Sequence, residues 1–197
     1  MTPTDPTYLA LRMKAVESLL IEKGIVSSEA IEAITDAYER DIGPMRGAAV
    51  VARAWVDDDY KRRLLSDAPA AVAELGIGGF GAETLVVVPN TARIHNVVVC
   101  TLCSCYPWAL LGLPPRWYKT PEYRARVVRW PRRVLTEFGL TLPNDVEIRV
   151  WDSSSEARYM VRPQRPAGTD GLAERELAAL VTRDAMIGTG VVSNPAS

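Results

Sequence analysis

The sequence predicts an α+β protein in which a helical N-terminal extension precedes a layered, mixed α/β globular domain. Apolar residues recur at helical spacing through the first forty positions, and four short runs rich in β-branched residues follow between residues 84 and 161. Stretches of helical character surround these runs in mixed order. We expect the helical arm to cover residues 1–45 and the globular domain to cover residues 46–197.

The arm is expected to contain two amphipathic helices. The apolar face of the first helix is formed by Leu9, Met13, Val16 and Leu20. We expect Gly24 to end this helix, Ser28 to cap the second helix, and Gly43-Pro44 to end the second helix. The two apolar faces need a surface to cover them, and the pattern allows either the rest of the chain or a partner chain.

The globular domain begins with a stretch that reads as helical from residue 48 to residue 75. Asp57-Asp58-Asp59 is expected to break this stretch and to supply an N-cap. A loop rich in glycine follows, with Gly76, Gly78, Gly79 and Gly81. This loop lacks the Gly-Lys-Ser/Thr ending of a phosphate-binding loop, so we interpret it as a turn.

Strands are expected at residues 84–88 and 94–99, and the second strand runs directly into Cys100. A loop at the end of a strand is a common position for a functional site. The remaining expected elements are a helix that starts at Thr120-Pro121-Glu122, a short helix at 131–138 ended by Gly139, strands at 146–151 and 157–161, and a last helix at 173–181.

The charge balance excludes two classes of partner. The chain has 23 Lys and Arg and 24 Asp and Glu, which gives a formal net charge of −1 and favours neither nucleic acid nor an anionic membrane. No apolar run approaches the roughly 20 residues that span a bilayer, and residues 1–10 lack the pattern of a signal peptide. The expected location is therefore the cytoplasm.

The three cysteines all fall between positions 100 and 105, in a Cys-x-x-Cys-x-Cys pattern. Such a cluster cannot staple distant segments, so it indicates metal or redox chemistry. The thiolates of Cys100, Cys103 and Cys105 can converge on one metal ion. The backbone amides of Ser104 and Cys105 are held close by, and as two further donors they would leave one octahedral position open for catalysis.

Two other interpretations of the cluster stay open at this point. A zinc site could recruit His95, which is the only histidine of the sequence, although its strand position can turn it away from Cys100. A thioredoxin-like redox pair would use Cys100 and Cys103, but it would not need Cys105, and no thioredoxin-like βαβ start precedes it.

The run Val-Cys-Thr-Leu-Cys-Ser-Cys-Tyr-Pro-Trp at residues 99–108 resembles the metal loop of the nitrile hydratase α-subunit family. The resemblance extends from about residue 8 to residue 188. It is carried further by residues 111–115, 117–119, 123–128, 151–156 and 163–169.

The resemblance implies the state of the ligands and the metal. Cys100 would bind as a plain thiolate, Cys103 would be oxidised to the sulfinic level and Cys105 to the sulfenic level. The amide nitrogens of Ser104 and Cys105 would complete the donor set.

The identity of the metal is also implied by the resemblance. Thr101 and Tyr106 are similar to the cobalt version of the loop, whereas iron members usually carry Ser and Thr at these positions. The implied metal is low-spin, non-corrin cobalt(III), in preference to iron.

The implied reaction is hydration of a small-molecule nitrile to an amide. The resemblance implies one of three mechanisms: the metal acts on the nitrile as a Lewis acid, the metal activates a hydroxide, or the Cys105 sulfenate oxygen attacks, and we favour this oxygen as nucleophile. Ser104 would accept a proton or donate a hydrogen bond, and Trp108 would form an aromatic wall of the pocket. An outer polar network, or alternatively a hairpin salt bridge, would involve Asp152, Glu156 and Arg158.

The resemblance implies a heteromer. In the family, arginines of a β-type subunit hold the oxidised cysteines, so we expect a β-type partner and an activator or metallochaperone. The arm before Gly43 fits a segment that lies on that partner.

The chain departs from the family pattern at Gly81, Pro89 and Trp130, where glutamine, glutamate and glutamate are usual. The small Gly81 would leave room for a bulkier nitrile.

Two rival functions remain. The metal-bearing subunit of thiocyanate hydrolase shares the Cys-Thr-Leu-Cys-Ser-Cys loop, and its substrate is thiocyanate. A non-catalytic zinc or redox module is the alternative from another class.

Overall fold

The computed structural model describes residues 6–36, 43–78, 84–103 and 105–193. The chain divides into two compact units, Met1–Asp41 and Ile42–Ser197. The α+β fold class is confirmed, since helices accompany small parallel sheets. Within the described residues, no helix combines the length and the apolar character that crossing a membrane requires.

The first unit contains the two expected helices, α1 (Pro6–Glu22) and α2 (Ser28–Asp36). Gly24 adopts a φ of 66° just after α1, which a residue with a side chain rarely adopts. The prediction that Ser28 caps α2 is wrong, because the hydroxyl of Ser27 accepts the Ala30 N–H at 3.1 Å. The side chains of α1 that are exposed include Leu9, Leu11, Met13, Val16 and Leu19.

The second unit begins with three helices, α3 (Met45–Val56), α4 (Asp58–Ser66) and α5 (Ala68–Ala73). The expected break at Asp57 is confirmed, because its carboxylate accepts the Tyr60 N–H at 2.8 Å and caps α4. The sequence analysis missed a second break at Asp67, whose side chain caps α5 in the same way. Gly79 and Gly81 lie outside the described residues.

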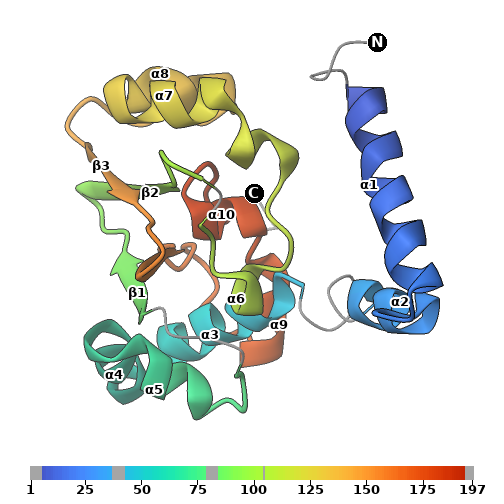
Figure 1. Cartoon of the computed structure of the whole chain (residues 1–197). Helices are drawn as coiled ribbons and strands as arrows, with labels where there is room; N and C mark the ends of the chain where they lie inside the picture. The colour runs from blue at the N-terminus through green and yellow to red at the C-terminus, as the bar shows by residue number, and fades with distance from the viewer. Residues whose placement is uncertain (1–5, 37–42, 79–83, 104, 194–197) are drawn as a thin grey trace. The chain divides into compact units, whose positions relative to one another are not determined.

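Four short strands form two parallel pairs: β1 (Thr84–Pro89) with β4 (Ala157–Arg162), and β2 (Ile94–Val99) with β3 (Glu147–Asp152). Strands that follow each other in the sequence therefore do not pair with each other (Figure 1). The interpretation of Asp152 to Arg158 as a hairpin with its own salt bridge is wrong for this reason. The register instead sets Val99 opposite Asp152, so that the residue before Cys100 lies beside the end of β3.

Helices surround the strand pairs. The segment between β2 and β3 forms α6 (Trp108–Leu111), the 3-10 helix η2 (Arg116–Lys119), α7 (Pro121–Arg129) and α8 (Pro131–Glu137). The chain then ends with α9 (Glu174–Leu180) and α10 (Arg183–Ile187), and the sequence analysis missed α10. Helix α8 contacts β3, whereas α4 and α5 contact β1 (Figure 1).

The core of the second unit is continuous beneath the cysteine loop. Val97, Val99 and Cys100 are fully buried, and they pack in one cluster with residues of α3, α6, α7 and α10. Burial of aliphatic side chains on both faces of β2 is what fixes the end of this strand. The loop that follows is thus anchored at a rigid point.

Candidate metal centre

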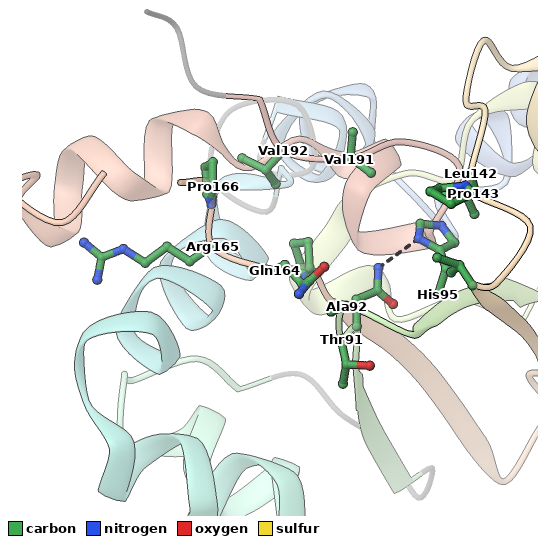
Figure 2. Close-up of a pocket in the computed structure, with 13 residues that line it drawn as sticks. Thr91, Ala92, His95, Leu142, Pro143, Gln164, Arg165, Pro166, Val191 and Val192 are labelled. Atoms are coloured by element: carbon green, nitrogen blue, oxygen red, sulfur yellow. Dashed lines mark hydrogen bonds between the residues drawn. The ribbon is translucent and has the colours of Figure 1, made fainter. Parts of the chain in front are cut away.

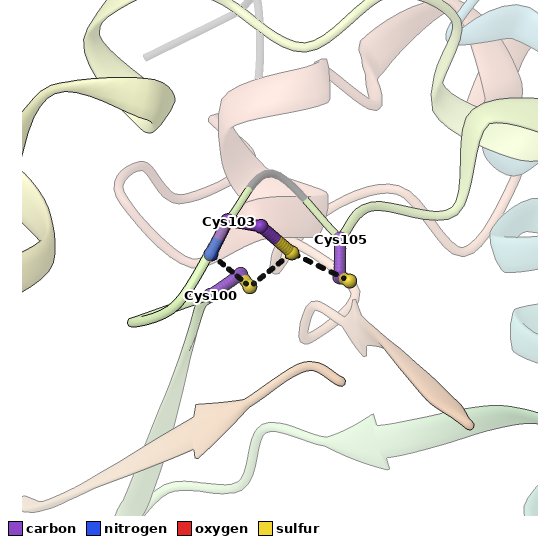
Figure 3. Close-up of side chains that lie close together, drawn as sticks. All are labelled: Cys100, Cys103 and Cys105. Carbon is purple, nitrogen blue, oxygen red and sulfur yellow. Dashed lines mark hydrogen bonds between the residues drawn. The ribbon is translucent and has the colours of Figure 1, made fainter. Parts of the chain in front are cut away.

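The three cysteines meet at the end of β2. Cys100 is fully buried, Cys105 is buried, and Cys103 is exposed between them. The Sγ atoms of Cys100 and Cys103 lie 3.3 Å apart, and those of Cys103 and Cys105 lie 3.1 Å apart (Figure 3). Among the described residues, these three form the group whose ligand atoms converge closely enough to hold a metal ion.

The sulfur spacing distinguishes between coordination geometries. With metal–sulfur bonds of about 2.3 Å, two sulfurs at right angles lie about 3.3 Å apart, whereas two tetrahedral sulfurs lie about 3.8 Å apart. The observed 3.1 Å and 3.3 Å match neighbouring positions of an octahedron. These two distances therefore fit neighbouring positions around a six-coordinate metal better than a tetrahedral zinc site. Ser104, the expected source of an amide ligand, lies outside the described residues.

His95 does not complete a zinc site. Its Nε2 donates to the Gly188 carbonyl at 2.7 Å, and its Nδ1 accepts from the Asn90 amide at 3.3 Å, so both ring nitrogens are used. It borders a cavity of about 340 Å³ at the start of β2, whereas the cysteines follow the end of this strand (Figure 2). Burial lowers the pKa of His95, and the bond to Gly188 only partly opposes this shift.

The environment of Cys105 opposes a free thiolate. Burial, the hydrogen bond that the Cys105 thiol makes with Cys103, and the nearby charge of Cys100 raise the pKa of Cys105 to about 12, although the charge of Arg158 acts in the opposite direction. A thiol in such surroundings becomes a ligand when a cation replaces its proton. The Cys105 thiol is therefore poorly suited to act as a freely ionised redox thiol.

Asp152 holds the start of the loop. Its carboxylate accepts the N–H of Thr101 at 2.9 Å and the hydroxyl of Thr101 at 2.6 Å. The guanidinium group of Arg124 donates to the carbonyls of Thr101 and Leu102. The sequence analysis assigned Asp152 to the surroundings of the site but missed Arg124, whose only signal was its place in the family-like segment 123–128.

Tyr106 lies directly behind the loop. Its ring is buried and meets the ring of Tyr118 edge to face at 5.1 Å. The Tyr118 hydroxyl donates to the Cys105 carbonyl at 2.9 Å, a contact that the sequence analysis missed. Burial raises the pKa of both phenols, so these side chains stay neutral and act by packing and hydrogen bonding.

The other expected site residues differ in their exposure and in their contacts. Trp108 starts α6 and is 37% exposed, and the Lys119 ammonium group lies 6.0 Å from its ring centre. The Arg158 guanidinium group donates to the Ser154 carbonyl. Glu156 is exposed in the turn before β4, where its carbonyl accepts the Thr84 N–H at 2.6 Å.

A family model described as "Nitrile hydratase, alpha chain" matches residues 7–190. The chain belongs to this family. Among curated relatives, the low-molecular weight cobalt-containing nitrile hydratase subunit alpha of Rhodococcus rhodochrous is 56% identical over 193 residues, which are 98% of this chain and 93% of the relative. The resemblance drawn from residues 99–108 is thereby confirmed.

Two further comparisons place the chain within the family. A double mutant of the Fe-type nitrile hydratase from Comamonas testosteroni Ni1 is similar with a TM-score of 0.90 and 43% identity, covering 98% of this chain and 94% of that one. The thiocyanate hydrolase subunit gamma of Thiobacillus thioparus is 46% identical, over 90% of this chain and 77% of the relative. Nitrile hydratase and thiocyanate hydrolase subunits thus share this fold.

Proposed function

We propose that this chain is the metal-bearing α-type subunit of a nitrile hydratase that adds water to a nitrile and releases the corresponding amide. The observation that carries this proposal is the convergence of three sulfurs at the end of β2, with Cys103 at 3.3 Å from Cys100 and 3.1 Å from Cys105, the spacing of neighbouring ligands on a six-coordinate metal. Cobalt is favoured over iron because the 56% identical Rhodococcus relative is described as cobalt-containing, whereas the Fe-type structure is 43% identical.

The metal would be non-corrin cobalt(III), held by Cys100, Cys103, Cys105 and the amides of Ser104 and Cys105. Bound there, it would supply a Lewis acid for the nitrile. Cys103 is proposed to be at the sulfinic level and Cys105 at the sulfenic level. The sulfenate oxygen of Cys105 is the proposed nucleophile toward the nitrile carbon. This oxygen would leave in the amide as its S–O bond breaks, while a water oxygen forms the new S–O bond and the two protons of that water go to the amide nitrogen.

The remaining site residues are proposed to bind the nitrile or to hold the metal loop in place. Trp108 offers part of its ring to solvent beside the loop, which suits the wall of a pocket for an apolar nitrile substituent. The Ser104 hydroxyl is proposed to carry a proton near the open position. Asp152 holds Thr101, and the positive charge of Arg158 acts on Cys105.

The working enzyme is proposed to be a heteromer with a β-type subunit, and an activator or metallochaperone would load the metal. The exposed apolar side chains of α1, including Leu9, Met13 and Val16, support an arm that lies on the partner. Their burial would stabilise the complex through the hydrophobic effect.

Thiocyanate hydrolysis is the second candidate function, and the 46% identity with the Thiobacillus subunit favours it. One experiment separates the two. The chain is co-expressed with its β-type partner in cobalt medium, and the purified complex is analysed for metals, intact mass and turnover of nitriles and thiocyanate.

We expect about one cobalt per chain, a mass gain of about three oxygens and nitrile hydration. We also expect Cys103→Ser to abolish cobalt binding without unfolding the chain, because Cys103 is exposed and fills no part of the core. Zinc without added oxygens would contradict the proposal, and turnover of thiocyanate alone would favour the second candidate.

A further inference from the structure

The peptide group between Leu102 and Cys103 is hydrogen-bonded at both ends. Its N–H, carried by Cys103, donates to the Sγ atom of Cys100 at 3.2 Å. Its C=O, carried by Leu102, accepts from the Arg124 guanidinium group at 3.1 Å. A single peptide group thus connects a fixed positive charge with a sulfur of the metal centre, and hydrogen bonds in such a chain polarise one another.

Arg124 also holds the preceding peptide group. Its Nη2 donates to the Thr101 carbonyl at 2.9 Å, and its Nε lies 3.3 Å from the same oxygen. Asp152 accepts the N–H and the hydroxyl of Thr101. Side chains of opposite charge, from α7 and from the end of β3, therefore fix the two sides of Thr101. Charge-assisted hydrogen bonds of this kind are about twice as strong as neutral ones.

Helix α7 gives Arg124 a rigid base. Thr120 caps the helix by accepting the Tyr123 N–H at 3.3 Å. The buried hydroxyl of Tyr123 then donates to the Val98 carbonyl at 2.7 Å. Two consecutive residues of the first turn thus hold the end of β2 and the loop that follows it, so the position of the guanidinium group is fixed relative to Cys100.

We propose that Arg124 is a positioning residue of the metal centre, which orients the Leu102–Cys103 peptide and thereby sets the donor strength of the Cys100 sulfur. This inference rests on the proposed function, since it concerns a metal-bound sulfur. A hydrogen bond to a thiolate withdraws electron density from it, so weakening this bond makes the sulfur a stronger donor. Arg124 acts through this peptide group, and it is not proposed to touch the cysteine sulfurs or the substrate.

The geometry also predicts which substitution at Arg124 keeps part of its hold on the Leu102–Cys103 peptide. Arginine presents several N–H donors in a fixed fork, so it can serve two carbonyls together, whereas lysine offers a flexible point charge. Arg124→Lys should therefore preserve part of the effect, and Arg124→Gln should lose most of it. Arg124 lines an open cavity of about 320 Å³, where water can hydrate the released carbonyls, so we expect both variants to fold.

The test uses the complex of the full chain with its β-type partner, loaded with cobalt. Wild type, Arg124→Gln, Arg124→Lys and Arg126→Gln are compared by the energy of the sulfur-to-cobalt charge-transfer absorption and by the rate of cobalt loss to a chelator. Arg126 is the matched control, because it lies on the same helix but pairs with the exposed Glu137.

In Arg124→Gln, we expect the charge-transfer band to move to lower energy, because the Cys100 sulfur becomes a stronger donor. We also expect cobalt loss to become about 10- to 100-fold faster, because the loop loses the hydrogen bonds from Arg124 to the Thr101 and Leu102 carbonyls and no longer holds its ligands in place. Arg124→Lys should show a smaller shift in the same direction, and Arg126→Gln should match wild type. Thermal unfolding of each variant is measured alongside. If Arg124→Gln does not fold, the band position of Arg124→Lys decides.

Two results would overturn the inference alone: a cobalt-loaded wild type whose Arg124 variants keep its band position and loss rate, or an Arg126→Gln variant that changes as much as Arg124→Gln. A wild-type complex that takes up no cobalt would overturn the proposed function and, with it, this inference. The wild-type cobalt content therefore separates the two failures.

Discussion

The carboxylate of Asp152 accepts two hydrogen bonds from a single residue, Thr101: one from its N–H at 2.9 Å and one from its hydroxyl at 2.6 Å. Parallel pairing of β2 with β3 makes this possible, because the register sets Asp152 opposite Val99, two positions before Thr101. The pair ties the metal loop to the neighbouring strand. It also gives Thr101 a physical role, because its hydroxyl donates to a carboxylate oxygen of Asp152 that would lose this hydrogen bond if residue 101 were alanine.

The first prediction concerns this pair. Asp152→Asn replaces one acceptor oxygen with an NH₂ group, which cannot accept either of the two Thr101 donors. We expect the loop to be less well fixed and the cobalt content or affinity of the complex to fall about 10- to 100-fold. Elemental analysis with chelator competition measures this change. Asp145→Asn, an exposed carboxyl in the turn before β3, is the control and should keep its cobalt.

The second prediction concerns Trp108. Trp108→Leu removes an aromatic surface from the proposed pocket wall, so we expect kcat/KM for an aromatic nitrile to fall about 10- to 100-fold. Cobalt content should stay unchanged, because the substitution leaves the cysteines in place. Trp130→Leu is the matched control, since Trp130 is exposed at the end of α7. Equal losses in the two variants would contradict the assignment of Trp108.

The third prediction concerns Gly188, which ends α10 with a φ of 95°. A Cβ atom at this position would overlap the carbonyl of Asn96 in β2. Backbone strain and overpacking together should lower the free energy of unfolding of Gly188→Ala by about 2–6 kcal/mol. Urea denaturation measures this loss.

Gly190→Ala is the control for this substitution. The nearest atom to a Cβ there is 3.6 Å away, an ordinary contact, so its stability should stay within about 1 kcal/mol of wild type. A Gly188→Ala variant as stable as Gly190→Ala would show that α10 does not press on β2 as the structure describes.

The fourth prediction concerns pH. Burial lowers the pKa of His95 below its ordinary value of 6.5, so between these two pKa values the unfolded chain binds a proton that the folded chain does not. This contribution to stability is therefore complete above 6.5 and is lost as the pH falls through 6.5 toward the pKa of the folded state. Below that pKa the contribution changes no further.

Urea denaturation at pH values of about 7.5 and 5.5 tests this expectation. His95→Gln should lose less free energy of unfolding over that interval than wild type, because glutamine does not titrate. Carboxyl groups contribute equally to the pH dependence of the free energy of unfolding in wild type and in His95→Gln. The difference between the two slopes of free energy against pH therefore isolates the contribution of His95. Identical slopes would contradict a lowered pKa at this residue.

The extent of the elements was largely readable from the sequence, and the pairing of the strands was not. Local signals such as the caps at Asp57 and Thr120 act within one turn of helix, so they are visible in sequence. Asp67 and α10 were missed because short helices give too few residues to show a period. The pairing of the strands depends on packing between segments that are distant in the sequence, and a local sequence pattern does not indicate such packing.

The sequence by itself determined that three cysteine sulfurs come together on one turn, because Cys100, Cys103 and Cys105 lie within six positions. Only the tertiary structure decided what surrounds them. Asp152 lies 51 positions from Thr101, and Arg124 lies 23 positions from the same residue. These residues meet through the β2–β3 register and the packing of α7 on β2. The ligands are therefore local in the chain, whereas the groups that orient them depend on the whole fold.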